Sequence, residues 1–156
     1  MSIIPYKTKD STPVASFFRE IFRELGWEER DSDHMDKPHL LFHLPEKGIL
    51  FLVKEKEKVI GTGGFIVLND YDGLIKRFYV AKSYRGTGIA QKLLYELIKK
   101  AKLLGLKRLI LDVSKDNSRA IRFYEKNGYI KTQVAPQEGW PESFTPETHY
   151  FFYKLI

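Results

Sequence analysis

The feature that most constrains the fold of this chain is a glycine-containing junction between an apolar run and a long amphipathic pattern. Residues 85–90 read Arg-Gly-Thr-Gly-Ile-Ala, and they follow the apolar residues 78–80. Two glycines let a backbone approach a ligand closely, and the N–H groups at the start of a helix favour phosphate oxygens. The junction therefore predicts a strand, a loop and a helix that form a site for a phosphorylated cofactor.

The amphipathic pattern begins at Gly88 and ends near Gly105, a plausible C-cap. A buried strand is predicted over residues 109–113, and residues 117–129 follow it with a second helical pattern. The apolar positions of the first pattern recur at helical spacing and place one face of the helix in the core. They are Ile89, Leu93, Leu94, Leu97, Ala101 and Leu104.

At these residues the sequence resembles the GNAT superfamily of acyl-CoA N-acyltransferases. The resemblance covers roughly residues 48–135, and its two motifs stand in the family's order. Arg85, Gly88 and Ala90 occupy the defining positions of an Arg/Gln-x-x-Gly-x-Gly/Ala loop, and Asn117 and Tyr124 follow later. The resemblance implies one α/β (α+β) domain over residues 1–156. Its sheet would be mixed and mostly antiparallel, with six or seven strands flanked by about four helices.

The resemblance also implies the roles of individual residues. The loop would bind the coenzyme A pyrophosphate, residues 78–80 would pair their backbone with the pantetheine arm, and Tyr124 would protonate the leaving thiolate. Asn117 would contact the cofactor, although a helix N-cap is an equally good use of this residue and the two roles are compatible. The cofactor would enter a V-shaped gap between the strand ending near Val80 and the strand through Asp112. The implied cofactor-binding residues are Phe78, Tyr79, Val80, Arg85, Gly86, Thr87, Gly88, Ile89, Ala90, Gln91, Asn117 and Tyr124.

The implied reaction is transfer of the acetyl group of acetyl-CoA to a primary amine by direct attack. The chain has no cysteine and no serine elbow motif, so a covalent acyl-enzyme is disfavoured. A backbone N–H near Tyr79 or Val80, exposed where the strand bulges, would donate to the oxyanion. The amine acceptor is not identified by the sequence, because substrate loops vary within one fold.

The sequence does not identify the residue that acts as the general base. Many relatives carry Glu in the strand before the loop, where this chain has Leu74, which cannot accept a proton. Other relatives use an acid at the position of Asp112, which makes Asp112 the candidate catalytic base beside Tyr124 as the acid. Asp70 and Asp72 could act through water instead. The leucine also motivates an alternative function, a CoA-binding sensor that has lost its chemistry.

A dinucleotide-binding fingerprint is the main competing interpretation of the glycine loop. Gly86 and Gly88 would be its first two glycines, but Gln91 stands where the third is required. Lys76 and Arg77 also interrupt the leading strand, whereas a central parallel strand is usually a nearly continuous apolar run.

Composition limits the partners. The formal charge of +6 suits an anion such as coenzyme A, and it also suits a nucleic acid. Acidic residues interleave with the lysines and no aromatic stacking platform accompanies them, so we expect no nucleic acid partner. Without cysteines, a signal peptide or an apolar run near 18 residues, the chain is expected to be cytoplasmic and not in a membrane. His39 and His43 have i,i+4 spacing, but Pro38 and Pro45 bracket them and no metal site is expected.

The remaining segments complete the expected fold. Residues 2–8 predict a first strand, and Thr12 as N-cap with Pro13 at the first position predicts a helix that ends at Gly26. Residues 49–53 and 59–68 predict a hairpin whose glycines permit a bulge or the close approach of a neighbouring backbone. In the family arrangement residues 27–47 would line the acceptor side. A last strand is expected from His149 to Leu155, and its aromatic residues 150–153 could pair across a homodimer.

Overall fold

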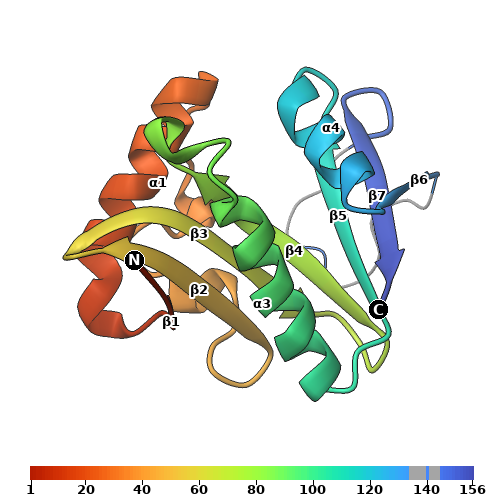
Figure 1. The fold of residues 1–156 in the computed structure, drawn as a ribbon, viewed down its shortest axis with the longest axis horizontal. Helices are drawn as coiled ribbons and strands as arrows, with labels where there is room; N and C mark the ends of the chain where they lie inside the picture. The colour runs from red at the N-terminus through yellow and green to blue at the C-terminus, as the bar shows by residue number, and fades with distance from the viewer. Residues whose placement is uncertain (134–139, 141–144) are drawn as a thin grey trace. The chain divides into compact units, whose positions relative to one another are not determined.

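The computed structural model describes residues 1–133, 140 and 145–156, and Figure 1 labels its elements. The chain divides into two compact units. The first unit consists of residues 1–66 and 76–97, and the second consists of residues 67–75 and 98–156. The strands are β1 (Ser2–Pro5), β2 (Gly48–Glu55), β3 (Lys58–Val67), β4 (Asp72–Val80), β5 (Arg108–Ser114), β6 (Ile130–Thr132) and β7 (His149–Leu155). The helices are α1 (Ser11–Leu25), α2 (Pro38–Leu41), α3 (Ile89–Leu103) and α4 (Ser118–Lys126).

The strands form one seven-stranded sheet in the order β1-β2-β3-β4-β5-β7-β6. The pairs β1–β2, β2–β3, β5–β7 and β6–β7 are antiparallel, and β4 pairs with β5 in parallel. The mixed, mostly antiparallel sheet and the four helices are the fold class that the sequence predicts.

The hairpin of β2 and β3 shows why glycines recur in its second strand. A Cβ on Gly63 would lie 2.8 Å from Cδ2 of Phe78, and a Cβ on Gly64 would lie 2.5 Å from Cε1 of Phe42. Real Cβ atoms are not found so close to a neighbour, so both positions require glycine for close approach. The expectation of a close neighbouring backbone is confirmed at Gly64, where a Cβ would meet the backbone oxygen of Ile49, and the side chains of Phe78 and Leu93 lie against Gly63.

Helix α1 begins earlier than the sequence predicts. A short 3-10 turn at Thr8–Asp10 leads directly into it, so Asp10 rather than Thr12 stands at the N-cap position. Pro13 therefore lies within the first turn, where its missing N–H is still harmless. The predicted end is confirmed, because Gly26 caps the helix with φ of 73°.

Asp10 forms a buried ion pair in the first unit. Lys54 Nζ donates to its Oδ1 at 2.7 Å, and the backbone N–H of Lys7 donates to Oδ2 at 3.2 Å. Burial on its own raises the pKa of this carboxyl, but these hydrogen bonds outweigh the burial and hold the pKa below its usual value near 3.8. A lowered carboxyl pKa contributes stability that is present above the unfolded-state pKa and is lost as the pH falls through the folded-state pKa.

Replacing Asp10 by asparagine is therefore expected to lower the free energy of unfolding at pH 7 by about 2 kcal/mol, the scale of hydrogen bonds to a charged group. The difference from the wild type should shrink as the pH falls below 4, because the wild-type carboxyl becomes protonated there. Urea unfolding at pH 7 and pH 3 measures both. Asp116→Asn, at an exposed position, is the control, and an equal loss in both variants would contradict the prediction.

In the second unit, an Asx turn begins strand β4. The Asn69 side-chain oxygen accepts from the N–H groups of Tyr71 and Asp72 at 2.8 and 2.7 Å. The following parallel ladder pairs Asp72 with Arg108, and Leu74 with Ile110. The turn thus leads directly into the first residues of the strand, Asp72 and Gly73.

Helix α3 and strand β7 have nearly the predicted bounds. The expectation that Leu104 lies on the buried face of α3 is wrong, because the helix ends at Leu103 and Leu104 is exposed. Gly105 ends α3 with φ of 81°, and the N–H of Leu106 donates to Ala101 O at 3.0 Å, which closes the last turn. Strand β7 pairs with β5 on one side and with β6 on the other. Residues 151–153 thus have backbone partners on both sides, so pairing across a homodimer would have to use other contacts of residues 150–153, and the homodimer stays a prediction. Val134, Pro136 and Pro141, at or after the predicted end of β6, lie outside the described residues.

Candidate functional site

The loop between β4 and α3 has the conformation that its glycines predict. Gly86 and Gly88 have φ of 76° and 85°, in the left-handed region that other residues rarely adopt. A Cβ added at either position would meet nothing within 4 Å. Glycine is therefore required here by backbone conformation, and space is left above the loop for a ligand.

The start of α3 supplies backbone donors next to these glycines. The N–H of Lys92 donates to Gly88 O at 3.1 Å, which is the first full turn of the helix. The amides of Ile89, Ala90 and Gln91 precede that bond, so they have no partner within the helix. Such a first turn carries partial positive charge and can hold a phosphate group.

Arg85 is held by protein groups of the first unit. Its Nε donates to Val80 O at 2.9 Å, and its two terminal nitrogens pair with both carboxylate oxygens of Glu24 on α1. The guanidinium therefore joins the end of β4, the loop and α1. An Arg85 contact to a phosphate stays a prediction, and it would require the side chain to leave Glu24 or to share it.

The strand before the loop, β4, contains one residue in the left-handed conformation. Arg77 has φ of 54°, and its carbonyl accepts from Thr62 Oγ1 of β3 at 2.7 Å. The bulge expected near Tyr79 or Val80 stays a prediction, and the left-handed Arg77 precedes these residues by two to three positions. Phe78 packs over Gly63, and Val80 is buried.

Asn117 and Tyr124 lie on α4 in the second unit. Asn117 is the N-cap, and its side-chain oxygen accepts from the N–H of Ala120 at 3.2 Å, which confirms the capping role. Tyr124 is 6% exposed, and its ring meets those of Phe123 and Tyr129 edge-on at 5.4 and 5.3 Å. Its ring is therefore fixed by aromatic packing, as a residue that delivers a proton needs to be.

Tyr129 is an aromatic neighbour of Tyr124, and the environment of its hydroxyl is defined by burial. Its hydroxyl is buried and has no hydrogen-bond partner among the described residues. Burial raises the pKa of this phenol well above its usual value near 10. Its proton therefore stays in place across the physiological range.

The candidate bases have different environments within the second unit. Asp112 accepts from Trp140 Nε1 at 2.9 Å. Asp72 is buried, and Arg108 donates to both of its oxygens at 2.6 and 3.0 Å, which raises the pKa of the arginine. A carboxylate so fully paired is a poor proton acceptor, so the geometry favours a structural role for Asp72. Asp70 is exposed, and Leu74 is completely buried.

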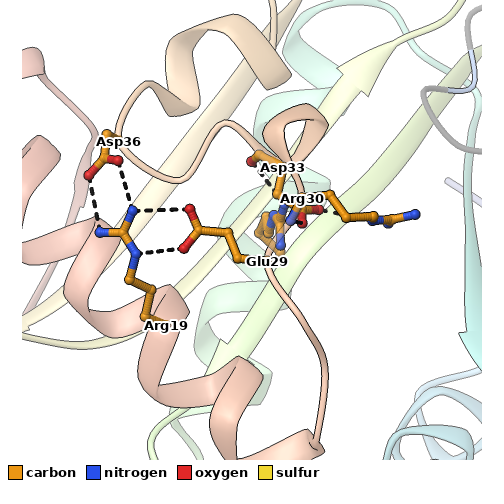
Figure 2. A network of polar contacts seen from close by, with 6 residues as sticks. Arg19, Glu29, Arg30, Asp33 and Asp36 are labelled. Atoms are coloured by element: carbon orange, nitrogen blue, oxygen red, sulfur yellow. Dashed lines mark hydrogen bonds and ion pairs between the residues drawn. The ribbon is translucent and has the colours of Figure 1, made fainter.

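The segment after α1 contains charged contacts that the sequence did not predict. Arg19 of α1 pairs with both Glu29 and Asp36, and Asp33 lies beside them (Figure 2). Arg77 of β4 donates to Asp33. The acidic residues alternate with other types between residues 28 and 36, but nothing in their spacing identifies arginines on α1 and β4 as partners.

The described residues contain no group of three or more His, Asp or Glu side chains that could hold a metal ion. His39 lies on α2, which ends at Leu41, and His43 follows outside it with φ of 51°. The expectation that no long helix presents both histidines is confirmed. Among all the residues that the structure describes, no helix is both long and apolar enough to cross a bilayer.

Comparison with known proteins gives the family. Residues 15–129 match the model of the acetyltransferase (GNAT) family. An acetyltransferase from Yersinia pestis is 37% identical over 127 residues, which cover 74% of this chain and 86% of the relative. A GNAT acetyltransferase structure from Staphylococcus aureus has a TM-score of 0.81 at 24% identity and covers 99% of this chain and 98% of that one. An aminoglycoside 6'-N-acetyltransferase complexed with coenzyme A has a TM-score of 0.74 at 18% identity, over 99% and 97%.

Several curated relatives are longer than the matched part. An uncharacterised N-acetyltransferase from Bacillus subtilis is matched over 38% of its length, and human N-acetyltransferase 8B over 52%. This chain thus spans about half or less of the length of these relatives.

Proposed function

Because this chain belongs to the acetyltransferase (GNAT) family, we propose that it transfers the acetyl group of acetyl-CoA to a primary amine by direct attack. The observation that carries the proposal is the pair of left-handed glycines, Gly86 and Gly88, directly before the first turn of α3. This arrangement suits a diphosphate, because both glycine positions are open and the first-turn amides have no helical partner. The coenzyme A complex of a protein with a similar fold supports the choice of a CoA thioester.

The proposed chemistry divides among a few groups. Acetyl-CoA, when bound, supplies the thioester carbon that the amine nitrogen attacks. A backbone N–H in residues 78–80 would donate to the carbonyl oxygen as negative charge develops there, and one such donor is worth about 3 kcal/mol. The carbon–sulfur bond then breaks, the sulfur takes a proton, and the new amide loses one.

Tyr124 is proposed as the group that gives the proton to the sulfur. A phenol with a pKa of about 10 is protonated at neutral pH and can serve a departing thiolate. The edge-on contacts with Phe123 and Tyr129 restrict the ring, so the hydroxyl direction would be set before the cofactor binds.

Asp112 is proposed as the base that takes the proton from the amine, directly or through water. The hydrogen bond from Trp140 Nε1 to Asp112 Oδ2 would hold this carboxylate in place for the transfer. Replacing Asp112 by asparagine is expected to lower kcat about tenfold near pH 7, since water can relay part of the transfer. The loss should diminish at high pH, where the amine is already neutral.

The pH profile of kcat for Asp112→Asn measures this effect. Asp72→Asn is the comparison, because it removes a carboxylate that Arg108 already occupies. A larger loss of kcat in a folded Asp72→Asn variant than in Asp112→Asn would contradict the assignment.

The acceptor side is proposed to be formed in part by residues 27–47, between α1 and β2. The amine could be a polyamine, an aminoglycoside, a peptide N-terminus or a lysine side chain. We therefore propose a screen with acetyl-CoA and spermidine, kanamycin A, a glycyl peptide and a lysine peptide. A mass increase of one acetyl group in any of them supports the function.

Calorimetry with coenzyme A completes the test. Binding of coenzyme A without acetylation of any amine would favour the sensor, the alternative that the buried Leu74 motivates. Failure to bind coenzyme A at all would overturn both functions.

A further inference from the structure

Arg77 is a buried charged residue of the first unit. It is 8% exposed, and it lies in β4 directly before residues 78–80 with φ of 54°. A non-glycine residue in this region costs of order 1 kcal/mol or more, and it persists only where its surroundings hold it. The hydrogen bond from Thr62 Oγ1 holds the carbonyl of Arg77. The contacts of the Arg77 side chain are the other interactions that hold this residue in its left-handed conformation.

The guanidinium of Arg77 is held by two elements that precede it in the chain. Its Nη2 donates to the backbone oxygen of Asp33 at 3.0 Å and to Oδ1 of the same residue at 3.2 Å. The guanidinium carbon lies 5.3 and 5.0 Å from the ring centres of Phe18 and Phe22 on α1. A buried cation needs such partners, because its desolvation is otherwise not compensated.

The carboxylate and the backbone carbonyl of Asp33 both accept hydrogen bonds. Asp33 is 2% exposed and ends the 3-10 turn at Asp31–Asp33. Its Oδ2 accepts from the N–H of Arg30 at 2.7 Å, while its Oδ1 and its carbonyl face Arg77. Both carboxylate oxygens and the backbone of this turn are therefore used, and the turn cannot move without breaking a buried ion pair.

We infer that Arg77 is a positioning residue, which fixes residues 30–36 to β4 through its buried contact with Asp33. The inference rests on the proposed function, in which residues 27–47 line the acceptor side. One side chain then ties the acceptor segment to the strand position that precedes the backbone proposed to hold the thioester. The placement of the amine and the placement of the reactive carbonyl are thereby coupled.

Arg19 provides a contrast on the same segment. It pairs with Glu29 at 2.7 Å and with Asp36 at 2.8 Å, but all three side chains are well exposed. Exposed ion pairs contribute little to stability, whereas a buried pair that loses one partner leaves an unpaired charge. The segment should therefore depend on Arg77 and much less on Arg19.

The test is a double-mutant cycle on the full chain with Arg77→Met, Asp33→Asn and the double variant. Methionine keeps much of the volume between the rings of Phe18 and Phe22 but removes the charge. We expect each single variant to raise the KM for the acetylated amine of the screen five- to tenfold. The double variant should be no worse than either single one, and the Kd for coenzyme A should stay within twofold.

Arg19→Met is the matched control and should change the amine KM less than twofold. Unchanged amine KM in folded single variants, effects that multiply in the double variant, or a loss in Arg19→Met as large as in Arg77→Met would overturn the inference.

A second measurement keeps the inference separate from the proposed function. Hydrogen exchange with mass spectrometry should show faster exchange in residues 30–36 for Arg77→Met, with β2 unchanged. Exchange equal to the wild type would overturn the inference whether or not an amine is acetylated. If no amine in the screen is acetylated but residues 30–36 lose protection, the proposed function fails while the role of Arg77 in fixing the segment stands.

Discussion

Replacing Tyr124 by phenylalanine is expected to lower kcat by about 100-fold, the lower end of what a general acid contributes. The change removes one oxygen atom and keeps the ring that packs edge-on against Phe123 and Tyr129. Folding and the Kd for coenzyme A should therefore be nearly unchanged. Steady-state kinetics with the amine of the screen, together with calorimetry of coenzyme A, separate the two effects.

Tyr129→Phe is the matched control for Tyr124→Phe. Its ring meets that of Tyr124 edge-on, and its hydroxyl is buried without a hydrogen-bond partner among the described residues. Removing an unpaired buried polar group is close to neutral or stabilising. This variant should keep its kcat within twofold and unfold at the same or a higher temperature. Wild-type kcat in Tyr124→Phe, or an equal loss in both variants, would refute the role of Tyr124.

Replacing Gly88 by alanine is expected to weaken coenzyme A binding by roughly 10- to 100-fold, because one or two charge-assisted hydrogen bonds to phosphate are lost. Alanine disfavours the φ of 85° found at this position, so the loop must change its backbone or carry strain. Either response turns the amides at the start of α3 away from a common centre. Calorimetry with coenzyme A gives the change in Kd.

Gly105→Ala is the matched control, because Gly105 lies just beyond the other end of α3. Its φ is 81°, and a Cβ there also meets nothing within 4 Å. The two substitutions should therefore destabilise the protein similarly, by about 1–2 kcal/mol of left-handed strain. Only the variant at Gly88 should lose affinity for coenzyme A. Similar affinities in the two variants would show that the loop does not bind the diphosphate.

The local patterns that the sequence predicts well are those with a short-range cause. The glycines of the loop, the end of α1 at Gly26 and the Asn117 cap each depend on residues within one turn of them. Hydrophobic periodicity likewise gave α3 and β7 to within about two residues, because each buries a continuous apolar face. The fold class itself follows from the resemblance to the GNAT superfamily, which these local patterns accompany.

The features that the sequence did not predict depend on partners far apart in the chain. Thr12 with Pro13 is a good helix start on its own, but the contact between Asp10 and Lys54 of β2 accompanies an earlier beginning. The pairs Arg77–Asp33 and Arg85–Glu24 join residues more than forty positions apart. Charge alone does not identify such partners. The sequence therefore predicts an Arg85 available for phosphate, and it presents Arg77 only as an interruption of a strand.

The order of strands in the second unit also constrains how this unit can form. Strand β7 follows β6 in the chain, yet it lies between β5 and β6 in the sheet. During synthesis, β6 therefore has no backbone partner until residues 151–153 have emerged, and β5 lacks its antiparallel neighbour for the same interval. Pairing of this kind between distant residues slows folding. The nascent chain must keep two incomplete strand edges from associating with other chains until the seven residues of β7 insert between them.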